Sequence, residues 1–193
     1  MGRAAGGFLI LCFAAIVASA STAAPGRTVV HRFHAFKDGR VAPGVHVLRN
    51  AKGYCWTTSD LESRRYTWRC FERNLILDPC FSPTRHASFA LCPSEPWSEN
   101  VLRLQLTRPL PSWQPFVNNK GLPVGVRTTT GKRCARSSGA AGEIARKPIT
   151  YQCKGGGLLV GFAHRGTRVW TISFASGFKA RRLRRVGITD AWW

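Results

Sequence analysis

Residues 101–107, Val-Leu-Arg-Leu-Gln-Leu-Thr, alternate apolar and polar side chains without a break, and this stretch decides the fold class. Its three leucines fall on one face of an extended chain, which is the pattern of a half-buried strand. Residues 168–174 repeat the pattern and place Trp170, Ile172 and Phe174 on one face. Further strand signals lie at 29–36, 45–49, 67–71, 124–128, 149–153 and 186–192.

Helix signals are scarce by comparison. Ser59-Asp60-Leu61-Glu62 has the spacing of a capping box and predicts one short helical turn before Tyr66. No segment sustains a period of 3.6 residues over three turns, and Gly and Pro clusters separate the strand signals. We therefore predict an all-β fold, a disulfide-stapled sandwich or barrel-like domain with little helix.

The second half of the chain repeats features of the first. Gly-Val begins a segment that ends at a cysteine in both halves, and an aromatic residue precedes the next cysteine. Either the chain is a degenerate duplication or two cysteine-bearing β segments resemble each other by chance. We expect a single β domain over 44–193, made of related halves 44–108 and 124–193. A Pro-rich segment joins the halves. We do not expect the halves to be independent, because each alone is too small to bury much core.

The N-terminus has the organisation of a secretory signal peptide. Arg3 precedes an apolar stretch from Ala4 to Ala18, and Ala18-Ser19-Ala20 supplies small residues at a cleavage position. We predict a signal peptide over 1–20, cleavage near Ala20, and a secreted or extracytoplasmic protein with an N-terminal arm over 21–43. The alternative is that the segment is kept as a membrane anchor.

Cleavage near Ala20 would leave six of the seven cysteines, and an even number in an exported chain implies disulfides. Six cysteines allow 15 pairings, and the internal similarity favours one in which each half has its own bridge. The predicted pairs are Cys55–Cys70, Cys134–Cys153 and, closing the remaining segment, Cys80–Cys92.

A cysteine and tryptophan framework runs through most of this region. It includes Gly53-Tyr54-Cys55-Trp56, Trp68-Arg69-Cys70, Asp78-Pro79-Cys80-Phe81, Cys92-Pro93, Pro96-Trp97, Tyr151-Gln152-Cys153, Gly155-Gly156-Gly157 and Ala191-Trp192. The framework, over about Gly44 to Trp193, resembles that of a group of small secreted actinobacterial proteins. The resemblance implies export and a bacterial source, and it carries no activity, ligand or catalytic residue.

The charge balance is the strongest functional signal. The chain of 193 residues has 29 Lys and Arg against 9 Asp and Glu, a formal net charge of +20. Five cations gather between Gly177 and Gly187 in what we call the basic segment: Lys179, Arg181, Arg182, Arg184 and Arg185. Such a cluster attracts polyanions through counterion release, without reading a sequence. The alternative interpretation is a solvated loop in an arginine-rich chain.

Catalytic and metal motifs are missing from the sequence. It has no G-x-S-x-G elbow, H-E-x-x-H motif, P-loop or dinucleotide fingerprint. His31-x-x-His34 lacks a third ligand, so we predict neither a metal nor a cofactor. Paired carboxylates for glycoside hydrolysis remain possible, although in so basic a chain we expect them to pair with arginines, which lowers their pKa. The acids concerned are Asp60, Glu62, Glu72, Asp78, Glu95, Glu99 and Asp190. Of these, Asp78 is expected in a turn, because it precedes Pro79.

These observations leave three functional hypotheses. The first is a non-enzymatic, monomeric, secreted β domain that adsorbs to anionic wall polymers, glycans or lipid head groups, and to nucleic acid only non-specifically. The second is a small envelope hydrolase or hydrolase inhibitor, and the third is a structural secreted protein with no polyanion partner. Most tryptophans are expected in the core, with Trp113 and Trp193 as the better candidates for exposed rings.

Overall fold

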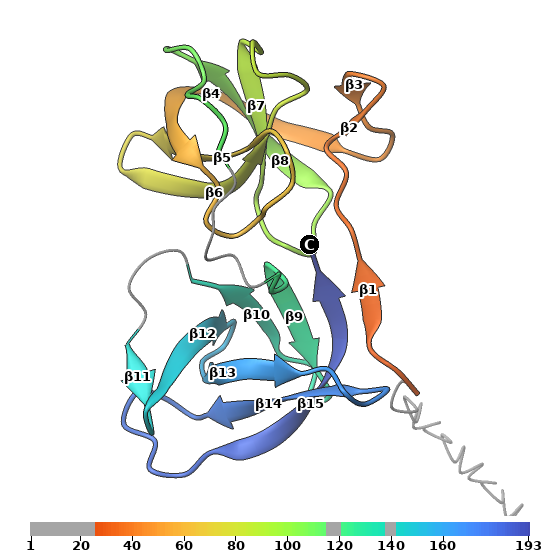
Figure 1. The fold of residues 1–193 in the computed structure, drawn as a ribbon, viewed down its shortest axis with the longest axis vertical. Coiled ribbons are helices and arrows are strands. Elements are labelled where there is room, and N and C mark those ends of the chain that lie inside the picture. The colour runs from red at the N-terminus through yellow and green to blue at the C-terminus, as the bar shows by residue number, and fades with distance from the viewer. Residues whose placement is uncertain (1–25, 115–120, 138–141) are drawn as a thin grey trace, which may run out of the picture.

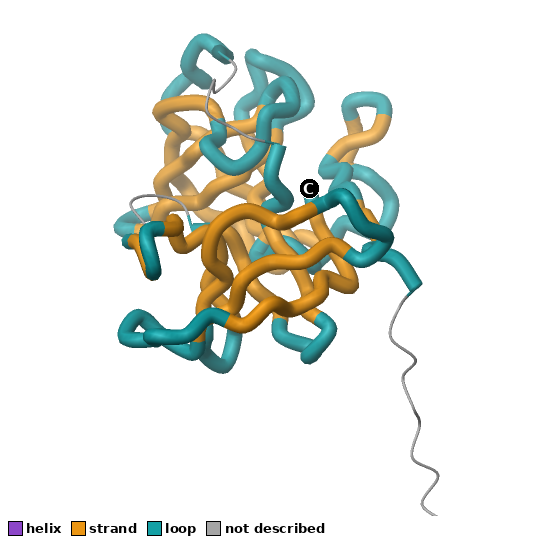
Figure 2. Tube along the Cα trace, turned by 60° about the horizontal axis from the view of Figure 1, so that its bottom comes forward, coloured by secondary structure: helices purple, strands orange, loops and turns teal. Residues whose placement is uncertain are grey.

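The computed structural model describes residues 26–114, 121–137 and 142–193, and all regular structure in these ranges is β-strand (Figure 2). The strands form two small closed barrels, stacked along the long axis of the molecule (Figure 1). The predicted all-β, disulfide-stapled, barrel-like fold with two similar halves is therefore confirmed. The predicted signal peptide lies outside the described residues.

The N-terminal barrel closes through a parallel pair. Strands β4 and β8 run side by side from His46↔Asn100 to Gly53↔Leu106, and the other neighbours in the order β4-β5-β6-β7-β8 are antiparallel. The alternation read at 101–107 holds, because Leu102 and Leu104 are buried while Arg103 and Gln105 are exposed. The strands of this barrel are β4 (His46–Thr58), β5 (Thr67–Glu72), β6 (Leu75–Phe81), β7 (Phe89–Pro93) and β8 (Asn100–Leu106).

The C-terminal barrel closes where its last strand returns to its first. Strand β15 pairs with β9 from Ile188↔Thr128 to Trp192↔Gly125, which completes the order β9-β10-β12-β13-β14-β15. Val126, Tyr151, Leu159 and Ile188 fill its interior. Its strands are β9 (Gly125–Thr128), β10 (Arg133–Arg136), β11 (Glu143–Ile144), β12 (Lys147–Cys153), β13 (Leu158–His164), β14 (Trp170–Ala175) and β15 (Arg184–Trp192).

The predicted N-terminal arm is built into the fold and touches both barrels. Strand β1 (Val29–His31) adds to β15 in parallel, while β2 (Phe36–Lys37) and β3 (Arg40–Val41) form a small hairpin beside the N-terminal barrel (Figure 1). Between them Phe33 is buried with Phe81 and Leu91. The arm therefore links the two barrels along one side.

Three disulfides join the same cysteines that the sequence analysis pairs: Cys55–Cys70, Cys80–Cys92 and Cys134–Cys153. Cys55 faces Cys70 across β4 and β5, and Cys134 faces Cys153 across β10 and β12. Each of these two bridges thus joins neighbouring antiparallel strands within its own barrel. In the chain-entropy model, loops of this size stabilise the fold by about 3 kcal/mol each.

Two local predictions are wrong. The segment 59–66 is a loop: Ser59 Oγ accepts the N–H groups of Leu61 and Glu62, as an N-cap would, but no helix follows. Thr67 Oγ1 instead donates to the carbonyl oxygens of Glu62 and Arg64, so tertiary contacts occupy acceptors that a helix would need. Asp78, expected in a turn before Pro79, lies within β6.

The two barrels meet over a tight junction. The loop between β7 and β8 carries Pro96 and Trp97 against β9, where Gly125 leaves no room for a side chain. Trp97 meets Trp192 edge to face with ring centroids 6.0 Å apart, and Glu95 forms an ion pair with Lys154 of the C-terminal barrel. A cavity of about 180 Å³ remains beside these contacts, between the barrels.

Candidate functional site

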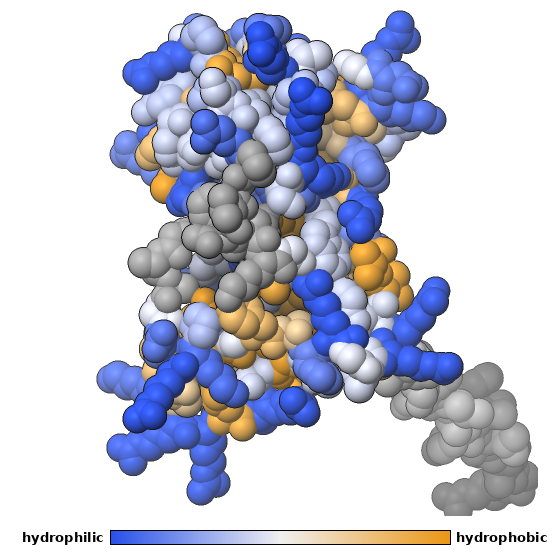
Figure 3. All heavy atoms as spheres, viewed as in Figure 1, coloured by the Kyte–Doolittle hydropathy of each residue, from blue (hydrophilic) through white to orange (hydrophobic). Residues whose placement is uncertain are grey.

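The basic segment lies at the turn between β14 and β15, and all five of its cations are exposed. Hydrophilic side chains project from the end of the C-terminal barrel that faces away from the N-terminal barrel (Figure 3). The segment has an apolar anchor, because Ala180 and Leu183 pack against buried Ile144, Ile149 and Val160. The structure therefore presents these cations from a fixed turn.

The five cations have no acidic partner. Within the described part of the chain, none of their side chains makes an ion pair or a hydrogen bond, and Arg184 only packs over the ring of Phe174 at 4.6 Å. Residues 121–193 contain only two carboxylates, Glu143 and Asp190. Asp190 is buried in its own ion pairs, so the charge of the basic segment is available to an external anion.

A groove of about 340 Å³ extends this charged surface across β12, β13 and β14. Arg185 of the basic segment lines it together with Lys147 and His164. Arg185 sits opposite Ser173 in the β14–β15 pair. Arg185 therefore belongs both to the basic segment and to the groove, where Lys147 is a second cation.

Most candidate carboxylates are paired with cations, as the sequence predicts. Arg69 pairs with Asp60, Arg64 with Glu62 at 2.9 Å, and Arg49 reaches both oxygens of Glu72 at 2.5 Å. The hydrogen bond and charge of Arg49 hold the pKa of Glu72 below its usual value, against the opposing effect of burial. Glu72 is therefore a poor general acid near neutral pH.

Asp190 is held in a similar way on β15, where strand β1 of the arm pairs with the C-terminal barrel. It accepts hydrogen bonds from His31, Arg127 and Thr189 at 2.7–2.8 Å. Burial raises its pKa, but these hydrogen bonds outweigh burial and keep the pKa below its usual value. His31, considered above as a metal ligand, thus pairs with Asp190 and stacks on Trp192 with ring centroids 5.1 Å apart.

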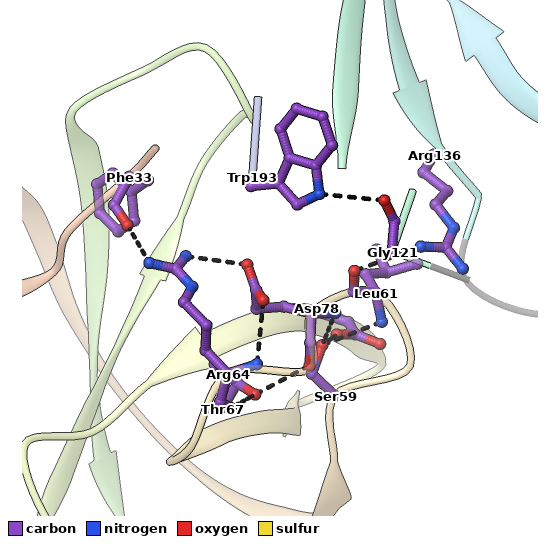
Figure 4. Close-up of polar contacts among 10 residues, drawn as sticks. Phe33, Ser59, Leu61, Arg64, Thr67, Asp78, Gly121, Arg136 and Trp193 are labelled. Atoms are coloured by element: carbon purple, nitrogen blue, oxygen red, sulfur yellow. Dashed lines mark hydrogen bonds and ion pairs between the residues drawn. The ribbon is translucent and has the colours of Figure 1, made fainter. Parts of the chain in front are cut away.

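Asp78 departs from the expectation of a lowered pKa. Its side chain is fully buried at the wall of the inter-barrel cavity, and this burial raises its pKa to about 6. Ser59 donates to one carboxylate oxygen, and the backbone N–H of Asp60 donates to the other at 3.2 Å (Figure 4). Both interactions favour the ionised form, but desolvation exceeds them.

The inter-barrel cavity is lined from both barrels and from the arm. Phe33, Leu61, Phe81, Val124 and Trp193 supply apolar walls. Three ionisable groups share the lining: Asp78, Glu95 and Arg136. Arg136 enters from the end of β10 and donates to the carbonyl oxygen of Leu61 at 3.3 Å (Figure 4). The sequence offers Asp78 only as one of seven candidate acids and does not single out Arg136, because only the docking of the barrels brings the two together.

The tryptophans are distributed differently from the prediction. Trp68 is fully buried as expected, but Trp113 and Trp193 are only partly exposed and pack against the two barrel cores. Trp56 has the more exposed ring, at 37%, and lies against Phe71 with ring centroids 4.5 Å apart. The expectation of exposed rings at Trp113 and Trp193 is therefore wrong.

One group of three potential metal-ligating side chains lies close together in the described ranges. The sulfur atoms of Cys70, Cys80 and Cys92 lie within 4.8 Å of one another. All three cysteines are oxidised in two disulfides, so none is a thiolate that could bind a metal.

No family model, curated protein or solved structure matches this chain. Across the described residues, no helix has the length and apolar character needed to cross a membrane. The three disulfides are consistent with an extracellular protein.

Proposed function

We propose that this chain is a secreted, non-enzymatic protein that adsorbs to anionic polymers of a bacterial cell envelope through the basic segment. The observation that carries the proposal is the absence of internal partners for Lys179, Arg181, Arg182, Arg184 and Arg185 within the described residues. The sequence-based signal peptide and the disulfides support export. Wall teichoic acids, phosphorylated glycans and anionic head groups are the polyanions available there.

The local geometry supports electrostatic adsorption. Leu183 and Ala180 hold the turn on the barrel, so its backbone loses little further freedom on binding and only the cationic side chains have to be ordered. The groove beside the basic segment adds Lys147 to Arg185, so a polyanionic chain bound at the turn would meet a further cation there. Binding of this kind depends on charge density and salt, with no readout of a particular sequence.

A hydrolase is less well supported, although the inter-barrel cavity does contain two carboxylates. Glu95 is engaged by Lys154 and by Trp97, and both oxygens of Asp78 accept hydrogen bonds from the protein. A space of about 180 Å³ also leaves no room for a polysaccharide chain. The unpartnered cations outside the cavity therefore favour adsorption over hydrolysis.

Co-sedimentation of the oxidised protein with isolated bacterial cell walls tests the proposal. We expect binding at low salt that is lost at high salt and that weakens when Arg181, Arg182, Arg184 and Arg185 are all changed to Gln. A matched control changes four exposed cations of the arm and N-terminal barrel to Gln: Lys37, Arg40, Lys52 and Arg73. Equal loss in both variants, or no loss in either, would refute the assignment to the basic segment.

A further inference from the structure

The inter-barrel cavity has the size and walls of a small-molecule site. Its volume of about 180 Å³ exceeds the roughly 150 Å³ of an apolar protein cavity that holds benzene. Phe33 and Phe81 meet on its wall with ring centroids 5.3 Å apart, and Trp193 lines it from the C-terminal barrel (Figure 4). An aromatic ring with one small polar group fits these dimensions.

Arg136 is the polar group of the cavity that lacks a counterion. Its guanidinium makes one hydrogen bond, to Leu61, and no ion pair within the described ranges. Arg136 is half-buried, and this burial lowers the pKa of its guanidinium. A partly desolvated guanidinium gains most from an anion that accepts two of its N–H groups at once.

The two carboxylates of the cavity do not supply that anion. Both oxygens of Asp78 accept hydrogen bonds from Ser59 and Asp60, and Glu95 forms its ion pair with Lys154. Their charge disfavours any anion, and a dianion more than a monoanion. Arg136 can balance one negative charge, so a monoanion with an apolar body suits the cavity better than a dianion.

We propose that the inter-barrel cavity binds a small aromatic monocarboxylate, whose carboxylate accepts hydrogen bonds from Arg136 and whose ring packs against Phe33, Phe81 and Trp193. This site is separate from the basic segment, which lies at the β14–β15 turn. The ligand would contact both barrels, so its binding would also stabilise their docking.

Titration of the oxidised protein with benzoate, followed by ligand-observed NMR, tests this proposal. We expect saturable binding at one site and a dissociation constant at least about tenfold higher in Arg136→Met, since a hydrogen bond to a charged group contributes that much. Arg146→Met, which removes an exposed cation from the same barrel, should bind benzoate like the wild type. Benzyl alcohol, which lacks the charge, should bind at least tenfold more weakly than benzoate.

A second variant tests the space in the cavity independently of the charge of Arg136. Ala135 lines the cavity beside Arg136, and Ala135→Leu fills part of the space while keeping the guanidinium. We expect this variant, checked for folding by circular dichroism, to lose benzoate binding. Undiminished binding to either Ala135→Leu or Arg136→Met would overturn the proposal, and so would the lack of saturable binding to the folded wild type.

Discussion

A Cβ atom placed on Gly125 would lie 2.4 Å from the Cβ of Pro96, so the two barrels approach each other more closely than any side chain at position 125 permits. Gly125 begins β9, and Pro96 belongs to the loop between β7 and β8. The contact is therefore made between the barrels, and glycine is required there for space.

We predict that Gly125→Ala loosens the docking of the barrels. Overpacking at a well-packed contact usually lowers the free energy of unfolding by about 1–3 kcal/mol. Urea unfolding of the oxidised variant measures the loss. Gly142→Ala is the matched control, because a Cβ there meets no atom within 4 Å. If both variants unfold at the same urea concentration as the wild type, the close contact does not contribute to stability.

Asp78 should make stability fall as pH rises. Because burial raises its pKa to about 6 from an ordinary value of 3.8, the folded protein binds a proton more tightly than the unfolded chain. The Asp78 contribution is therefore complete below about pH 4 and is lost between pH 4 and 6, by roughly 3 kcal/mol. We therefore compare the unfolding free energies of wild type and Asp78→Asn at pH 4 and at pH 7. The difference between the two proteins should change by about that amount between the two pH values, with the wild type losing stability relative to the variant at pH 7. A difference that does not change with pH would contradict the assignment.

Asp190 should fasten strand β1 to the C-terminal barrel. We expect Asp190→Asn to lower the unfolding free energy by only about 1–3 kcal/mol, because the side chains it would release, His31 and Arg127, are about 40% exposed and can be solvated. Hydrogen exchange should report the change locally, as faster exchange at Thr28 and Phe33, whose backbone N–H groups at the two ends of β1 donate to Arg168 and Trp193. Glu143→Gln, at an exposed acid, provides the control. Unchanged exchange in β1 would show that backbone pairing alone holds the strand.

Much of the fold could be predicted because local alternation and cysteine spacing report directly on strands and bridges. The leucines of β8 and the pairing of Cys55 with Cys70 are examples. Strand β13 was missed because Leu158, Leu159 and Val160 are all buried, and an unbroken apolar run has no period of two. The prediction of a helical turn at Ser59 was wrong because Ser59 Oγ accepts backbone N–H groups as an N-cap does, although no helix follows.

The two candidate sites differ in whether a local sequence pattern reveals them. The basic segment is a run of neighbours in sequence, so counting residues finds it. Arg136 and Asp78 are far apart in the chain and share a cavity only because two barrels dock. No local pattern distinguishes Arg136, which lacks a counterion, from Arg64, which pairs with Glu62.

The salt dependence of binding to a soluble polyanion such as polyphosphate tests the central claim most directly. Each cation that neutralises a phosphate should contribute about 0.7–0.9 to the slope of log K against log salt concentration. We predict that changing Arg181, Arg182, Arg184 and Arg185 to Gln lowers the magnitude of that slope by roughly two to four. The control with Lys37, Arg40, Lys52 and Arg73 changed to Gln should keep the wild-type slope. An unchanged slope in the first variant would contradict adsorption through the basic segment.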